Sequence, residues 1–150
     1  MLPNQNIVAN YDYLDESGNL VFQVVRVQPK DPSEPKTFRQ RRPDGKGGWI
    51  WNLQGIRCVP YRLPEVLSAS PQEWIFVVEG EKDVDRLHDL QFTATCNPMG
   101  AGKWKDEYNA HFAGKLVAVV GDNDEVGRKH VEQVATALHG VAAKVRVIEL

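Results

Sequence analysis

The sequence predicts an α/β protein in which a parallel sheet with flanking helices follows a smaller segment rich in β-hairpins. Two observations in the 150 residues lead to this fold class. From residue 74 onward, short apolar runs typical of buried strands alternate with segments of helical periodicity. Before that residue, strand-like runs are separated by turn-forming residues and by a loop rich in proline and charge. We therefore expect a β-rich segment over residues 1–72 and an α/β domain over residues 73–150.

The first segment has the pattern of two hairpins. The turn-rich stretch Asp15–Asn19 separates the first pair of strands, and Pro43–Gly48 separates the second pair. Residues 61–67 are expected to form a short connector or a single helical turn. The predicted strands of this segment are residues 11–14, 20–27, 37–41 and 49–53.

The second segment combines four strand-like runs with three stretches of helical spacing. Because strands alternate with helices, the connections should be right-handed crossovers and the sheet should be parallel. The predicted strands are residues 74–79, 92–96, 115–120 and 144–150, and the predicted helices are residues 81–90, 104–112 and 126–138. In the last helix, one apolar face is expected to hold Val126, Val131, Val134, Ala135 and Leu138.

The composition is that of a soluble globular protein, with 42% hydrophobic and 25% charged residues. No apolar run approaches the about 20 residues needed to cross a bilayer. The N-terminal residues lack a basic-then-apolar signal, so we expect a cytoplasmic protein with no membrane partner. Cys58 and Cys96 are isolated from each other in sequence, which indicates neither a disulfide framework nor a zinc site.

The charge is distributed unevenly along the chain. Residues 1–64 hold nine Lys and Arg against six Asp and Glu, whereas residues 65–150 hold nine against fourteen. The first part thus favours a polyanion and the second concentrates carboxylates. This combination suits a metal-dependent site that acts on nucleic acid or nucleotides.

Acidic side chains follow two of the predicted parallel strands. Glu79 ends the first of these strands, and Asp122 and Asp124 follow the third. Side chains at i and i+2 of an extended segment point the same way, and ligands gather at the carboxyl ends of parallel strands. Several hard oxygens at one point match Mg²⁺, with Mn²⁺ as an alternative, and Glu79 could act as a ligand or a proton-transfer group. A purely structural alternative is that Asp122 caps the following helix, while Asp124 and Glu125 favour the positive end of its dipole.

Three other motifs do not match the residues around this edge. A helix-loop-helix calcium loop would need an oxygen ligand at Val126 and a glutamate at Gln133. A phosphate-binding P-loop would need glycine at Asn97 and Ser or Thr at Trp104. The dinucleotide fingerprint is absent. A phosphatase with an aspartyl nucleophile at Asp-x-Asp stays open as a minor alternative.

Taken together, these motifs resemble the TOPRIM domain shared by bacterial-type DNA primases and topoisomerases, which has a Rossmann-like sheet. The resemblance rests on VVEGEKDVDRL (77–87), a glycine loop and VVGDNDEVGRKH (119–130). The matching positions are Glu79, Gly80, Asp83, Asp122, Asp124 and Gly127. The stretches before residue 67 are similar to the region that precedes this domain in phage and plasmid primases, many of them primase-helicases.

The resemblance implies a magnesium-dependent nucleotidyltransferase that joins ribonucleotides into primers on single-stranded DNA during replication. By the same analogy, Asp122 and Asp124 would hold metal and Glu79 would assist catalysis or complete the metal site. A replicative helicase, attached or separate, is an implied partner. Such primases usually continue past the point matched by Leu150, so the chain is expected to be a fragment or a reduced relative. Two alternatives stay open: a nuclease of the same fold, and a non-catalytic module that binds single-stranded DNA.

Basic residues beside aromatic ones predict a nucleic-acid surface in the first segment, because cations bind phosphates and aromatic faces stack on bases. Arg39, Arg41, Arg42 and Lys46 lie near Phe38, Trp49 and Trp51 in sequence. The alternative is a solvated hairpin whose tryptophans are core residues. In the α/β domain, the candidates for phosphate contact are Lys82, Lys103, Lys105 and Arg128, and the candidate loop glycines are Gly80, Gly100 and Gly102. The four histidines share no ligand spacing and receive no chemical role.

Overall fold

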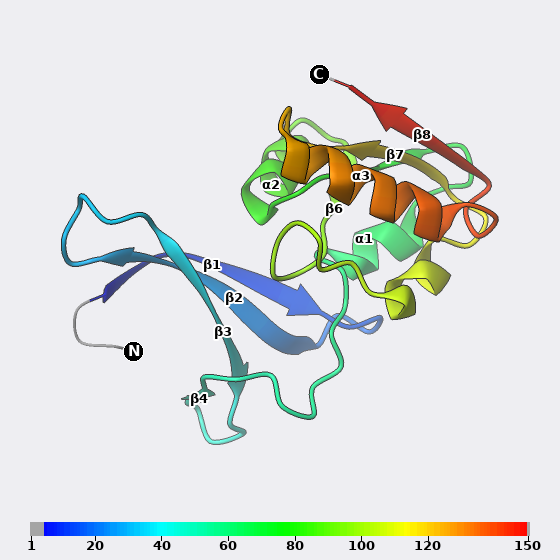
Figure 1. The fold of residues 1–150 in the computed structure, drawn as a ribbon. Coiled ribbons are helices and arrows are strands. Elements are labelled where there is room, and N and C mark those ends of the chain that lie inside the picture. The colour runs from blue at the N-terminus through cyan, green and yellow to red at the C-terminus, as the bar shows by residue number, and fades with distance from the viewer. Residues whose placement is uncertain (1–4, 150) are drawn as a thin grey trace. The chain divides into compact units, whose positions relative to one another are not determined.

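The computed structural model describes residues 5–149, and the chain divides into two compact units, residues 1–58 and 59–150 (Figure 1). Residues 1–4 and 150 lie outside the described part, so the predicted strand end at Leu150 lies outside it as well. Within residues 5–149, every helix is too short or too polar to cross a membrane.

The boundary between the units falls after Cys58 rather than near residue 72. The reason is that the segment after Cys58 already packs as part of the second unit. Val59 is fully buried, and the backbone N–H of Tyr61 donates to the carbonyl of Cys96 at 2.9 Å. The hydroxyl of Tyr61 also donates to Asp85 at 2.8 Å. These contacts join the connector to the α/β unit that follows it.

The first unit is an antiparallel sheet in the order β1-β2-β3-β4. Its strands are β1 (Gln5–Leu14), β2 (Leu20–Pro29), β3 (Thr37–Pro43) and β4 (Trp49–Ile50). The turn between β1 and β2 is held by Asp15, whose side chain accepts from the backbone N–H groups of Ser17 and Asn19, both at 2.9 Å. Tyr13 and Phe22 stack with ring centroids 4.5 Å apart and are fully buried. The two predicted hairpins are therefore confirmed, although β4 is shorter than the predicted strand 49–53.

The second unit is built on four parallel strands in the order β6-β5-β7-β8. The strands are β5 (Trp74–Val77), β6 (Thr93–Thr95), β7 (Leu116–Val120) and β8 (Lys144–Ile148). The helices are α1 (Leu63–Ser68), α2 (Glu81–Asp89), the 3-10 helix η1 (Asp106–Phe112) and α3 (Glu125–Leu138). The predicted α/β class and parallel sheet are confirmed, and the predicted helix 104–112 is a shorter 3-10 helix.

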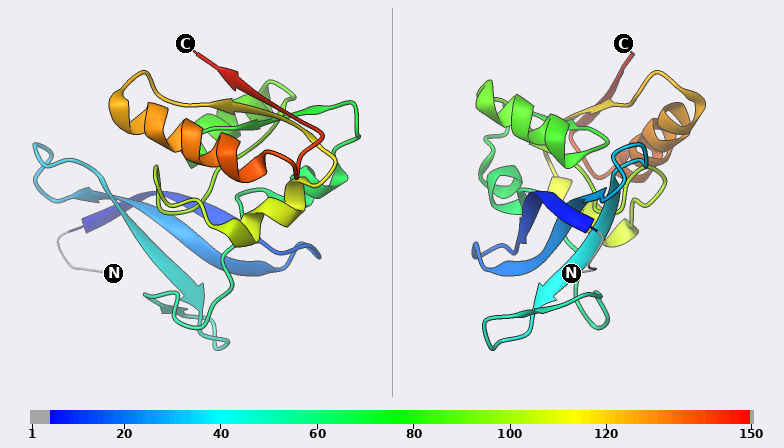
Figure 2. Two further views of the ribbon diagram at one scale, coloured as in Figure 1. Left: turned by 45° about the vertical axis from the view of Figure 1, so that its right-hand side comes forward. Right: turned by 90° about the vertical axis from the view of Figure 1, so that its left-hand side faces the viewer.

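Helices α2 and α3 cover opposite faces of this sheet, as the right-hand view of Figure 2 shows. The connection through α2 runs from β5 to its neighbour on one side, whereas the connection through α3 runs from β7 to its neighbour on the other side. Because such crossovers are right-handed, opposite directions place the helices on opposite faces. Ile75, Val117 and Val134 are fully buried in the resulting core.

The apolar face of α3 agrees with the prediction except at its first position. Val126 was expected to face the core, but it is 63% exposed, and Gly127 is buried instead. The inward position is occupied by glycine because the helix start lies against the backbone of Asp122, where no side chain fits. Val131, Val134 and Leu138 are buried as predicted.

Candidate active site

The carboxyl ends of β5 and β7 form the switch point of the parallel sheet. β5 leads to β6 on one side and β7 leads to β8 on the other, so the two connections diverge between these adjacent strands. Ligands of open α/β sheets bind at such a point. Glu79 lies two residues after β5, and Asp122 lies two residues after β7. Glu79 and Asp122, two of the predicted site residues, thus follow the ends of adjacent strands.

The carboxyl of Glu79 is half-buried, and its Oε1 has no hydrogen-bond partner among the described residues. Burial and the adjacent carboxyl of Asp122, with a further contribution from the charge of Asp124, raise the pKa of Glu79 to about 7. Burial raises this pKa because it disfavours the charged form, and nearby negative charge acts in the same direction. The carboxyl groups of Glu79 and Asp122 therefore repel each other when both are charged, and a bound proton or cation reduces this repulsion.

Asp124 has a structural contact that Asp122 lacks. Its side chain accepts a hydrogen bond from the backbone N–H of Gly127 at 2.6 Å and caps α3. Its own N–H donates to the carbonyl of Asp122 at 2.8 Å, which tightens the loop. The helix cap that could have been Asp122 is therefore Asp124. The side chain of Asp122 is exposed and lies beside Glu79.

Two glycines bring the strand end and the helix start together. A Cβ at Gly127 would lie 2.2 Å from the carbonyl oxygen of Asp122, and a Cβ at Gly121 would lie 2.3 Å from a methyl carbon of Val131. Real Cβ atoms do not approach so closely, so both positions need glycine. Gly127 belongs to the motif that we matched, but Gly121 was not predicted as a site residue. Its place in the sequence, directly between an apolar strand and Asp122, could have indicated its role.

The predicted glycine loop, residues 97–103, is held by hydrogen bonds to one of its own side chains and to a side chain of α3. Asn97 donates to the carbonyls of Pro98 and Gly100, both at 2.9 Å. Gly100 and Gly102 have positive φ angles of 85° and 80°, which explains why glycine occurs there. Gly80, in contrast, has an extended backbone, and a Cβ placed on it would meet no atom within 4 Å.

His130 also belongs to this region, although its sequence spacing indicated no chemical role. It is 2% exposed, and its Nδ1 accepts the backbone N–H of Gly102 at 2.9 Å. Burial lowers the pKa of His130, so the neutral ring that can accept this bond is favoured. Histidine spacing gave no signal for this contact. Its position on the same helical face as Val131 and Val134 would have indicated burial.

The carboxyl oxygens of Glu79 and Asp122 at the switch point could supply some of the ligands of a divalent cation that keeps several waters. Among residues 5–149, no three His, Cys, Asp or Glu side chains lie close enough together to enclose a metal. However, Mg²⁺ commonly uses one or two carboxylates and retains several waters. The unpartnered Oε1 of Glu79 beside the carboxylate of Asp122 matches that requirement.

The predicted nucleic-acid residues of the first unit divide into packed and accessible groups. Arg41 is 8% exposed, its Nε donates to Gln23 Oε1 at 2.7 Å, and its guanidinium lies 4.1 Å from the ring centroid of Trp49. Arg39 and Arg41 both lie against Trp51, at 6.0 and 5.2 Å, so they share a face as their spacing predicts. Arg41 thus contributes to the packing of its unit.

The remaining cations of that hairpin are more accessible. Arg42 is half-buried and donates to the side chain of Asn52 at 3.4 Å, whereas Lys46 is exposed at the tip. In the α/β unit, Lys82, Lys103 and Arg128 are exposed and form no ion pair with any described residue, while Lys105 lies 3.8 Å from Glu107.

The fold of the second unit and its switch point define a doubly wound α/β domain with two adjacent carboxyl groups at the carboxyl edge of its sheet. The first unit of the chain is an antiparallel β-sheet. The crystal structure of the Aquifex aeolicus primase (zinc-binding and RNA polymerase domains) has the same fold, with a TM-score of 0.67 over 93% of this chain at 17% identity. The alignment covers 33% of that chain, so this protein spans about a third of it.

The sequence comparisons are less extensive. No protein-family model matches the chain. The bifunctional protein FolD of Methanosarcina barkeri (strain Fusaro / DSM 804) is 29% identical over 84 residues, which cover 50% of this chain and 29% of FolD. At these levels of identity and coverage, the primase likeness establishes a primase-like fold.

Proposed function

We propose that this protein is a magnesium-dependent DNA primase domain of the TOPRIM type, which joins ribonucleotides on a single-stranded DNA template. The observation that carries the proposal is the Glu79–Asp122 pair at the switch point of a primase-like fold. The motif residues that resemble a TOPRIM domain occupy this same edge. The likeness of the first segment to phage and plasmid primases extends the proposal to that type of enzyme.

The roles of the acidic residues follow from their surroundings. Asp122 presents an exposed carboxylate for Mg²⁺ or Mn²⁺, and Asp124 adds its charge from the helix cap. The bound cation would offset the negative charge that develops during phosphoryl transfer. Glu79, whose carboxyl lies beside that of Asp122, is suited to complete the metal site or to accept the proton released by an attacking hydroxyl.

The template and nucleotide phosphates require cations to bind them. In the α/β unit, Lys82 and Lys103 are exposed and unpaired among the described residues. In the first unit, Arg39, Arg42 and Lys46 are the candidates for the DNA backbone, with Trp51 as a stacking face. A replicative helicase, which exposes single-stranded template, is the partner that completes the proposal.

Primer synthesis on single-stranded DNA with labelled ribonucleotides tests the proposal. Extension products should appear with Mg²⁺ and disappear when it is omitted. Asp122→Asn should abolish them, while Asp89→Asn, the same change at an exposed position at the end of α2, should not. Cleavage of labelled DNA without ribonucleotides would instead support a nuclease, and binding of DNA without either reaction would support a non-catalytic module.

A further inference from the structure

Two buried polar side chains hold the glycine loop, residues 97–103, by its backbone. Asn97 is 1% exposed and donates to two carbonyls of the loop, while His130 on α3 is 2% exposed and accepts from the N–H of Gly102. We infer that His130 is a positioning residue: it fixes this loop so that the ammonium of Lys103 binds a phosphate group of single-stranded DNA or of a nucleotide. The inference rests on the proposed function and adds the residue that orders the phosphate contact.

The backbone of the loop has a conformation that costs free energy. Met99, Gly100 and Gly102 have positive φ angles of 72°, 85° and 80°. Because Met99 is not a glycine, this conformation is strained, and its side chain is 41% exposed, so burial does little to offset the strain. Strained backbone that neighbouring side chains hold in place occurs mainly at binding and catalytic sites. The loop is therefore a candidate for presenting an exposed group to a ligand.

Lys103 is the group that the loop holds most firmly. The residue before it, Gly102, is bonded to His130. The residue after it, Trp104, is buried, donates its indole N–H to Asn109 at 2.8 Å and packs on two aromatic rings of η1. Lys103 is the only charged residue of the loop, its side chain is exposed, and it forms no ion pair within residues 5–149. Its backbone is thus anchored on both sides while its ammonium stays available.

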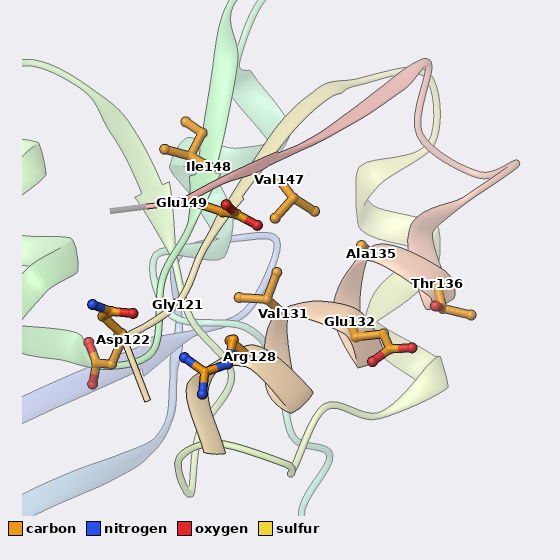
Figure 3. A pocket seen from close by; sticks show the side chains of 11 residues that line it. Gly121, Asp122, Arg128, Val131, Glu132, Ala135, Thr136, Val147, Ile148 and Glu149 are labelled. Carbon is orange, nitrogen blue, oxygen red and sulfur yellow. The ribbon is translucent and has the colours of Figure 1, made fainter. Parts of the chain in front are cut away.

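The loop borders both strand ends that carry the candidate site. It begins after Thr95, whose carbonyl accepts at 2.9 Å from the N–H of the residue before Glu79. Its other end is bonded to His130. The next residue of α3, Val131, lies against the glycine that precedes Asp122 (Figure 3). Carboxylates repel phosphates, so a phosphate that approaches this edge needs a cation at a defined position.

The position of the acceptor atom allows the role of His130 to be isolated. Nδ1 is the ring nitrogen nearer the backbone, so the carboxamide oxygen of an asparagine can take its place. Leucine has a comparable size but no acceptor. His130→Asn should therefore keep the bond to Gly102, and His130→Leu should release the loop. Amide hydrogen exchange of Gly102 measures this directly: it should be faster in His130→Leu and remain slow in His130→Asn.

Titrations with a labelled oligothymidylate and with ATP in the presence of Mg²⁺ identify the source of the phosphate. Lys103→Ala should weaken the binding of one of them about tenfold. If this is the oligothymidylate, the slope of log affinity against log salt should also become shallower by about 0.7. Lys129→Ala is the matched control, because Lys129 is an exposed lysine beside His130 that pairs with Glu125 at 3.3 Å. It should leave both affinities unchanged.

The double variant shows whether His130 acts through Lys103. His130→Leu should weaken the same ligand by a similar factor, and His130→Asn should restore most of the affinity. In Lys103→Ala, the further change His130→Leu should cause no additional loss, since the contact that it positions is already gone. Losses that multiply, an unchanged affinity in His130→Leu, or a wild-type protein that binds neither ligand would each overturn the inference.

The measurements do not depend on primer synthesis. If His130→Leu does not fold, His130→Gln replaces it, because glutamine places its acceptor one bond further from the backbone. Coupled losses of affinity in a protein whose wild type makes no primers would contradict the proposed function and support the positioning role. Primer synthesis by His130→Leu or its replacement with an unchanged KM for template and ribonucleotides would support the function and overturn the positioning role.

Discussion

The backbone N–H of Gly102 donates to Nδ1 of the buried His130 at 2.9 Å, which ties the glycine loop to α3. The contact joins two of the segments that surround the carboxyl edge of the parallel sheet. It requires a neutral histidine, because a protonated ring has no acceptor atom. The loop that carries Lys103 is therefore held by a group whose charge depends on pH.

The first prediction concerns this histidine and pH. Its pKa is lowered in the folded protein, so the unfolded chain binds the proton more readily. The stabilising contribution is thus present above the unfolded pKa of about 6.5 and is lost as the pH falls below it. His130→Gln should flatten this pH dependence and cost about 1–3 kcal/mol at pH 8. Urea unfolding from pH 8 to pH 5 measures both effects, and an unchanged pH slope in the variant would contradict the assignment.

The second prediction concerns Glu79, whose pKa is raised to about 7. The sign is opposite to that of His130: the stabilising contribution is fully present below the unfolded pKa and is lost as the pH rises through 7. Glu79→Gln should therefore raise the melting temperature at pH 8 relative to that of the wild-type protein. Mg²⁺ competes with the proton for this site, so it should stabilise the unchanged protein more at pH 8 than at pH 6.

Melting curves with and without Mg²⁺ at the two pH values provide the measurement for Glu79. Asp122→Asn should abolish the effect of Mg²⁺, and Asp89→Asn should leave it intact. The idea that Glu79 and Asp122 hold a cation would be abandoned if Mg²⁺ stabilised the Asp122→Asn protein as much as the unchanged one.

Much of the fold followed from local sequence patterns, whereas several contacts at the site depended on tertiary packing. Strands β5 and β7 of the α/β unit are short apolar runs, and such runs are visible in sequence. Their alternation with helices also predicted that Glu79 and Asp122 would approach the same edge. The role of His130 was not predictable, because its partner is a backbone N–H that lies 28 residues away in the chain.

Arg41 and Val126 illustrate two other limits. Arg41 belongs to a basic and aromatic pattern that suggested nucleic-acid binding, but the strand pairing places it beside Gln23, and it is buried. Val126 has the right spacing for the helix face, yet Gly127 takes the inward position because of the close approach to Asp122. In both cases the packing of distant segments determines which of two neighbouring residues is buried.

The third prediction separates the glycines near the site. Gly127→Ala and Gly121→Ala should destabilise the protein by about 1–3 kcal/mol, because the added methyl group would overlap atoms that have little room to move. Gly80→Ala should change stability by less than about 0.5 kcal/mol, since the position has an extended backbone and open surroundings. Chemical denaturation of the three variants measures the difference. Equal losses at all three positions would argue against the close packing of α3 on the Asp122 loop.

The fourth prediction separates structure from nucleic-acid binding in the first unit. Arg41→Ala should destabilise the protein by roughly 1.5–3 kcal/mol, because it removes a charged hydrogen bond to the buried Gln23 and a guanidinium packed on Trp49. Arg42→Ala and Lys46→Ala should leave stability nearly unchanged but weaken binding of labelled single-stranded DNA.

Fluorescence anisotropy at several salt concentrations tests the DNA prediction. For each phosphate that a variant no longer binds, the slope of log affinity against log salt should become shallower by about 0.7. Thermal unfolding of the same variants shows whether weaker binding comes from a less stable fold. If Arg42→Ala and Lys46→Ala both bind DNA with an unchanged slope, the hairpin does not bind the template, and the binding surface must lie on other cations such as Lys82 and Lys103.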